Sequence, residues 1–152
     1  MSRRSAVTSS VHVDRQPAEV FAYLADVGRH GEWSPKPYRV EGVAVGQQVA
    51  AGKRFTSFGW LPGDKDHRND VEATAVDAPN RLVLTSTDKG QIAVNTFTVA
   101  PDEDGSRVER VMDVQRPSGV VGVLFPVIAA LVIRPDVAKG LGRLKSTLEG
   151  RA

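Results

Sequence analysis

Residues 118–133 read SGVVGVLFPVIAALVI, a run of 16 residues without a charged side chain. An apolar stripe at helical spacing follows it, and the pattern predicts one long helix over about residues 119–149, which Pro135 should kink or split. The run is shorter than the about 20 residues that a membrane-spanning helix needs. We therefore predict that this helix covers the inner side of a sheet and lines a cavity, with a peripheral membrane contact as an alternative. The stripe consists of Val137, Leu141, Leu144 and Leu148.

Short segments of alternating apolar and polar residues precede this helix, and turn residues separate them. Hairpins at this spacing predict an antiparallel sheet, and a sheet of this size twists and curls. The pattern thus predicts an α+β fold in which a curved seven-stranded antiparallel sheet wraps around the long C-terminal helix. Two short helices, over about residues 17–25 and 26–33, should lie between the first and second strands. The strands are expected over about residues 7–13, 38–45, 53–61, 66–76, 81–87, 91–99 and 106–114.

Length and composition limit the classes of protein that this chain can belong to. Its 152 residues fit one domain over residues 1–152, with a disordered tail over residues 1–5. The net charge of +2, without a clustered basic face, argues against nucleic-acid binding. The chain has no cysteine, and the two arginines near its start precede no apolar segment, so we expect a cytoplasmic protein without a secretory signal. We also expect no stable membrane insertion and a monomer or homodimer.

Several stretches, in this order along the chain, carry a resemblance to a known superfamily. They are VHVDRQPAEVF over residues 11–21, WSP over 33–35, EATAVDAPNRL over 72–82, GSRVE over 105–109 and LKSTLE over 144–149. Together they resemble the START-like, or SRPBCC, superfamily with its helix-grip fold, and most closely its polyketide cyclase/dehydrase and lipid-transport branch. The resemblance implies an apolar cavity between sheet and helix. Members bind lipids, hormones or polyketides, and some catalyse cyclisation or dehydration.

Candidate ligand-binding residues are the aromatic and inward-facing side chains of this expected cavity. Ligand pockets are mainly apolar and aromatic with a few polar groups, although the same aromatic residues can simply fill the core. Arg110 shares a strand phase with Val108 and Met112, but an opposite phase, with Val111 inward, fits equally well. The candidates are Trp33, Tyr38, Phe55, Asn95, Phe97, Arg110, Met112, Phe125 and Ile128.

Few residues are candidates for catalysis. Arg110 could stabilise a developing oxyanion, and Tyr38 or His67 could move a proton. His67 lies in the polar stretch GDKDHRND, which is either a solvated hairpin or a polar rim at the cavity mouth. The three histidines are far apart in sequence, and there is neither a glycine-rich phosphate loop nor a nucleophile elbow. We therefore expect no metal and no cofactor.

Three functions remain open from the sequence. The first is a carrier or sensor that binds a small apolar molecule, lipid or polyketide-like, in the internal cavity. The second is a cyclase or dehydratase, a lyase-type enzyme that acts on an aromatic or polyketide-like substrate with polar cavity residues. The third is a stress or interaction protein that uses the apolar C-terminal helix as an exposed surface. The orientation of Arg110 and the exposure of residues 120–133 discriminate between them.

Overall fold

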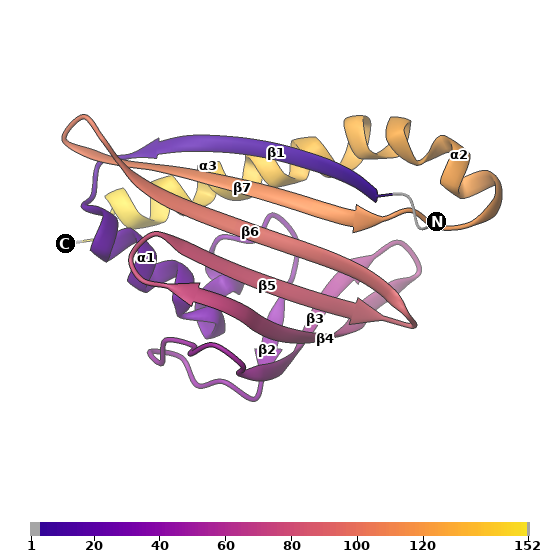
Figure 1. Ribbon diagram of the computed structural model, residues 1–152, viewed down its shortest axis with the longest axis horizontal. Coiled ribbons are helices and arrows are strands. Elements are labelled where there is room, and N and C mark those ends of the chain that lie inside the picture. The colour runs from indigo at the N-terminus through magenta and orange to yellow at the C-terminus, as the bar shows by residue number, and fades with distance from the viewer. Residues whose placement is uncertain (1–3, 152) are drawn as a thin grey trace.

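A computed structural model describes residues 4–151 as a single curved sheet with helices packed against it (Figure 1). The seven strands are antiparallel throughout and follow the order β1-β7-β6-β5-β4-β3-β2. This architecture confirms the predicted α+β helix-grip fold. The strands are β1 (Arg4–Val13), β2 (Arg39–Glu41), β3 (Arg54–Leu61), β4 (Asp64–Asp77), β5 (Arg81–Asp88), β6 (Gln91–Asp102) and β7 (Gly105–Gln115), and the helices are α1 (Pro17–Ala25), the 3-10 helix η1 (Val27–Glu32), α2 (Gly119–Ile128), the π-helical turn η2 (Ala129–Ile133) and α3 (Arg134–Glu149).

The first helix pair follows β1 directly, as its sequence predicts. Pro17 stands at the first turn, where its missing N–H costs nothing, and Glu19 faces the positive end of the helix. The apolar side of α1, with Val20, Phe21 and Leu24, is buried against the sheet. Helix η1 follows and ends next to Trp33, whose ring lies edge to face with Phe97 of β6.

The core lies between the concave face of the sheet, α1 and α3. Side chains alternate between the two faces of each strand, so that Phe97 and Val99 on β6 point inward together with Val108 on β7. Irregularities in pairing between β3 and β4 and between β4 and β5 accompany the bend of the sheet. Leu141, Leu144 and Leu148 of α3 complete this core, so the predicted apolar stripe is its helical side.

The C-terminal helix differs from expectation in its first half. Pro135 stands at the first turn of α3, and a π-helical turn separates α3 from α2, which agrees with the predicted interruption. Helix α3 packs along β1, whereas α2 projects past the start of β1 at the edge of the sheet (Figure 1). In α2 and η2 only Phe125 and Ala129 are buried. The prediction that residues 118–133 form a cavity wall is therefore wrong for most of their side chains.

Two further boundaries differ from the sequence-based expectation. Arg4 and Ser5 were expected in a disordered tail but belong to β1, because they pair with Gln115 and Val114 of β7. Residues 1–3 of that expected tail lie outside the described residues. Strand β2 is much shorter than expected, since the chain leaves the sheet after Glu41 at Gly42, whose φ of 95° suits a turn.

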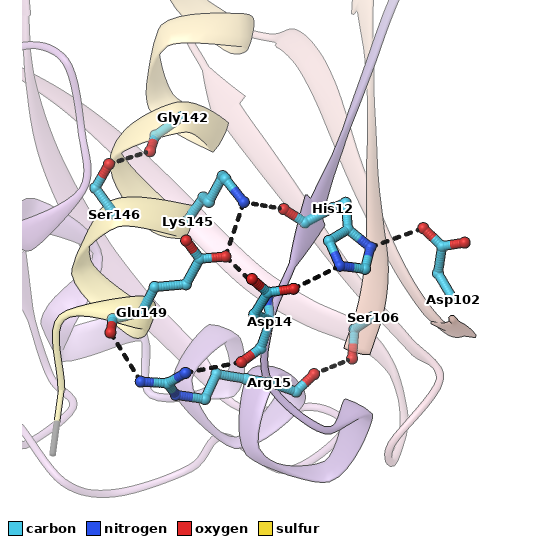
Figure 2. Close-up of polar contacts among 9 residues, drawn as sticks. All are labelled: His12, Asp14, Arg15, Asp102, Ser106, Gly142, Lys145, Ser146 and Glu149. Carbon is cyan, nitrogen blue, oxygen red and sulfur yellow. Dashed lines mark hydrogen bonds and ion pairs between the residues drawn. The ribbon is translucent and has the colours of Figure 1, made fainter. Parts of the chain in front are cut away.

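A polar network fastens the end of β1 to the end of α3 (Figure 2). The Lys145 ammonium donates to the His12 carbonyl at 2.9 Å and to the Glu149 carboxylate at 2.7 Å. That carboxylate also accepts the backbone N–H of Asp14 at 2.8 Å. On the other side of the strand, the His12 imidazole lies between the carboxylates of Asp14 and Asp102, at 2.8 Å and 2.9 Å. The network fixes how α3 lies on the sheet.

The position of His12 predicts a pH dependence of stability. Hydrogen bonds to Asp102 and Asp14 raise the pKa of His12 above 6.5. Because the folded-state pKa is raised, its contribution is complete below about pH 6.5 and is lost as the pH rises through the folded-state value. We expect the wild type to unfold at a higher temperature than His12→Asn below about pH 6.5. The difference should disappear as the pH rises through the folded-state pKa of His12. An NMR titration of His12 with a midpoint at or below 6.5 would contradict this.

Candidate functional site

Arg110 points to the concave side of the sheet, which decides between the two orientations left open by the sequence. Its neighbour across the β6–β7 ladder is Phe97, and its guanidinium carbon lies 5.3 Å from the centroid of that ring. The same carbon lies 5.9 Å from a Trp33 ring centroid. Its Nε donates a hydrogen bond to Asn95 Oδ1 at 2.9 Å. Two aromatic rings and an amide thus hold the guanidinium on the inner face.

The charge of Arg110 has no acidic counterpart. Within residues 4–151, no carboxylate lies within 4.0 Å of its guanidinium, and Asn95 provides its one side-chain hydrogen bond. Desolvation lowers the pKa of Arg110 to about 10, which still leaves it charged at neutral pH. A desolvated charge without a partner is costly. The unused guanidinium N–H groups are therefore available to an external acceptor.

Trp33, whose ring lies near the same guanidinium, carries a second unused donor. The side chain is 3% exposed, and its Nε1 is buried without a hydrogen-bond partner. The Cε3–Cζ3 edge of the indole faces Gly140 of α3, which has no side chain to hinder it. The opposite edge, which carries Nε1, is therefore turned away from α3. A buried N–H without an acceptor is rare in folded proteins and calls for an explanation.

The ring of His30 packs against the ring of Trp33. We did not predict His30 as a residue of this site. It is buried, and its Nε2 donates to the Leu24 carbonyl at 2.7 Å. Burial lowers the pKa of His30 to about 4, so the ring is neutral at physiological pH. Its centroid lies 4.9 Å from that of Trp33. A short helix with two glycines gave no sequence signal that this histidine would be buried.

The pKa of Tyr38, like that of His30, responds to the charge of Arg110. The Tyr38 ring lies against Gly59 of β3, and the side chain of Ser57 influences its hydroxyl. Burial raises the pKa of Tyr38, although Ser57 and the charge of Arg110 act in the opposite direction. The phenol is therefore protonated at neutral pH and acts as a hydrogen-bond donor. We refer to Trp33, Tyr38, Asn95, Phe97 and Arg110 together as the Arg110 cluster.

The inner face is accessible to solvent beside this cluster. Ala93, Asn95 and Met112 have the inward strand phase, yet each keeps part of its surface exposed, as does Arg110. Phe97 and Val108 on the same two strands are fully covered. The difference follows from the position of α2, which leaves this part of the sheet without the cover that the sequence led us to expect. The inner face is therefore open to solvent at Ala93, Asn95 and Met112, next to the Arg110 cluster.

The other predicted site residues lie outside the cluster. Phe55 belongs to the main core. Phe125 packs with Val7 in a second apolar cluster, and Met112 lies against it. Ile128 is half-buried on α2.

His67 lies in the hairpin region, where its ring contacts Asp64 at 2.9 Å and Asp88 at 2.6 Å. These hydrogen bonds raise its pKa above 6.5. Among the described residues, no hydrogen bond joins His67 to the Arg110 cluster, so the structure does not bring the three catalytic candidates together.

Two surface hollows lie elsewhere. A polar groove of about 660 Å³ follows the outer face of β3, β4 and β5, where Arg54, Glu72 and Thr85 line it. A smaller hollow of about 320 Å³ adjoins His67 at the hairpin ends. In the groove Arg54 pairs with Glu72, and in the smaller hollow His67 pairs with Asp64 and Asp88. Over residues 4–151, no three His, Asp or Glu side chains gather in a way that could hold a metal ion.

Comparisons with known proteins agree on the fold. A family described as "Polyketide cyclase / dehydrase and lipid transport" matches residues 4–149. A protein from Mycobacterium smegmatis is 18% identical, with a TM-score of 0.67 over 94% of this chain and 90% of that one. A protein from Thermus thermophilus is also 18% identical, with a TM-score of 0.71 over 95% of this chain and 97% of that one.

DynU16, from the dynemicin biosynthetic locus, is 16% identical, with a TM-score of 0.65 over 95% of this chain and 47% of DynU16. No curated protein matches the sequence. At these identities the solved structures establish the fold alone. The family match, which covers nearly the whole chain, confirms the resemblance seen in the sequence. The chain belongs to the polyketide cyclase/dehydrase and lipid transport family.

Proposed function

We propose that this protein binds a small amphipathic molecule on the concave face of the sheet, as a carrier or sensor. The molecule has an apolar, preferably aromatic, body and an acceptor head such as a carboxylate, an enolate or a carbonyl oxygen. One observation carries this proposal: the charged guanidinium of Arg110 lies without an acidic partner 5.9 Å from a ring centroid of Trp33, whose buried Nε1–H has no hydrogen-bond partner. Arginine binds carboxylates strongly because two N–H groups can bond both oxygens.

The surroundings of Arg110 favour an aromatic body over a purely polar ligand. Phe97 and Trp33 stand edge to face at 6.1 Å, and both lie near the guanidinium. The phenol of Tyr38 is a third donor, and its pKa responds to the charge of Arg110. Ligand sites of this kind combine apolar walls with a few placed polar groups. A location in the cytoplasm and a small-molecule partner, instead of a nucleic acid, belong to the same proposal.

A matched pair of probes tests the role of the head group. We expect 2-naphthoate to bind at least about tenfold more tightly than 2-naphthalenemethanol, because a hydrogen bond to a charged group adds about 1.5–3 kcal/mol. Isothermal titration calorimetry measures both affinities, and native mass spectrometry of the purified protein detects a co-purified acid. Equal affinities for the acid and the alcohol would refute the proposal.

A cyclase or dehydratase is the second candidate, and the pair Tyr38–Arg110 favours it. Arg110 would stabilise the enolate oxygen that forms when the acidic α-proton between two carbonyls passes to solvent water. After ring closure the Tyr38 hydroxyl would donate a proton to the β-hydroxyl as its C–O bond breaks and water leaves, and solvent would reprotonate Tyr38. The family description and the biosynthetic locus of DynU16 are consistent with such chemistry. In that case Tyr38→Phe should abolish the conversion of a poly-β-ketone thioester above its spontaneous rate and leave its binding intact. If the wild type converts the thioester no faster than the spontaneous reaction, the enzyme hypothesis is refuted and the carrier function is retained.

A further inference from the structure

The solvent-facing side of α2 and η2 is apolar throughout. Seven side chains there are each more than half exposed, and no charged residue lies between Arg116 and Arg134. Contiguous apolar surface of this kind marks an interaction site in soluble proteins. We call it the apolar ridge, and it consists of Val120, Val121, Val123, Leu124, Val127, Leu131 and Val132.

The shape of the apolar ridge discriminates between kinds of partner. At about 100° per residue, its side chains extend around roughly 180° of the helix, which is wider than the stripe of about 100° on an ordinary amphipathic helix. The remaining side holds Phe125 and Ala129, which pack with Val7 in the second apolar cluster. A single partner helix or a protein groove covers a narrow stripe. A lipid layer, in contrast, can contact half of the circumference of a helix that is embedded in it.

The length of the ridge fits a helix that lies in a membrane surface. The continuous helix Gly119–Glu149 is long and apolar enough to cross a membrane by length and composition, with a mean hydropathy of 2.0 in its most apolar window. Its second half, however, is fixed to β1 and to the core through Leu141 and Leu144. The free part over residues 119–133 is about 22 Å long, less than the about 30 Å of a hydrocarbon core.

Basic residues flank the ridge at both ends. Arg116 precedes it, and Arg134, Lys139 and Arg143 follow it. In the part of the chain that the structure describes, none of these four cations lies within 4.0 Å of a carboxylate. The acidic group nearest in sequence is itself paired, because Asp136 binds Lys36 at 2.8 Å. Arg116 donates its Nε–H to the Ser5 hydroxyl at 2.8 Å, which leaves its charge uncompensated. Cations without an acidic partner at both ends of an apolar helix are complementary to anionic lipid headgroups.

From these observations we infer that α2 docks on an anionic lipid surface. The apolar ridge sinks among the acyl chains, and the flanking arginines and lysine contact the headgroups. The inference is independent of the ligand at Arg110, because the ridge and the Arg110 cluster share no residue.

Vesicle co-sedimentation of the full chain tests this. We expect the wild type to bind vesicles of phosphatidylglycerol and phosphatidylcholine, and to bind more weakly at high salt or with phosphatidylcholine alone. The double variant Val123→Glu, Leu131→Glu should lose at least about tenfold in partitioning, because two charges then enter the acyl region. Val45→Glu is the matched control, since Val45 is equally apolar and 60% exposed in a distant loop, and it should bind like the wild type.

Two further measurements make each outcome decisive. Circular dichroism verifies that the double variant is folded, and the single variant Val127→Gln replaces it if the spectrum is lost. Light scattering after size exclusion gives the oligomeric state. A wild type that binds neither vesicle overturns the inference, and so does a folded ridge variant that binds like the wild type. If the wild type is a dimer that binds no vesicles, and the ridge variant is a monomer, the lipid inference is overturned. The ridge would then be an interface with a second copy of the chain.

Discussion

Replacing Arg110 with methionine is expected to weaken binding of an aromatic carboxylate by roughly 10- to 100-fold, since about 1.5–3 kcal/mol of charge-assisted hydrogen bonding is lost. The same change should raise the free energy of unfolding of the ligand-free protein. Methionine fills the space of the arginine stem without a desolvated charge, and replacing unpaired buried charges by apolar residues is often stabilising. Asn95 loses a partner, but it is half-buried and can bond water. Calorimetry and chemical denaturation measure the two effects.

The opposite signs of these two changes separate a ligand-binding role of Arg110 from a structural one. Arg107→Met is the matched control, because Arg107 lies on the same strand with its side chain on the exposed outer face. It should leave both quantities nearly unchanged. An Arg110→Met variant that keeps its affinity for 2-naphthoate within about twofold, or that unfolds more easily, would show that Arg110 only supports the fold.

Phe97→Ala is expected to have the largest effect on stability, a loss of about 3–5 kcal/mol, which is typical of a fully buried phenylalanine. The ring is 2% exposed and lies in contact with Trp33, His30 and Arg110, so its removal leaves a void at the centre of the core. Denaturant unfolding measures the loss.

The comparison for this variant is Phe58→Ala. Phe58 is half-buried with Arg39 over its ring at 3.9 Å. Its replacement by alanine should lower the free energy of unfolding much less. A Phe97→Ala variant that is no less stable than Phe58→Ala would mean that the core does not centre on this ring.

The fold could be predicted because local signals and tertiary structure agree along most of the chain. The turn at residues 77–80 and the glycine turns at Gly63 and Gly90 mark hairpins that the structure contains. Alternation places Phe97 and Val99 on the inner face without ambiguity. These signals are local, so one sequence is enough to find them.

The orientation of Arg110 could not be predicted in the same way. Val108, Val111, Met112 and Val114 are apolar on both phases of β7, so the alternation rule gives no answer. The structure decides through pairing with Ser9 on β1 and Phe97 on β6, which fixes Arg110 on the inner face. Such register depends on contacts between residues far apart in sequence.

The prediction that α2 forms a cavity wall was wrong for a related reason. An uncharged helical run has the same sequence pattern whether it is enclosed by protein or by lipid, since both environments are apolar. The sequence indicates only that the run is apolar. The observed contacts restrict burial to one narrow side, around Phe125, and leave the apolar ridge exposed. His30 was missed because its burial depends on η1, a 3-10 helix of six residues with weak helical propensity.

The central claim is that an acceptor head binds between Arg110 and Trp33, and NMR of the nitrogen-bound protons tests it most directly. The protein has two tryptophans, so the indole N–H of Trp60, under Lys36 at 5.3 Å, is an internal control. On titration with 2-naphthoate, we expect the Trp33 indole N–H and the Arg110 Nε–H signals to shift together with one dissociation constant, while Trp60 stays in place. Binding of 2-naphthoate that leaves both the Trp33 and the Arg110 signals unmoved would contradict the claim.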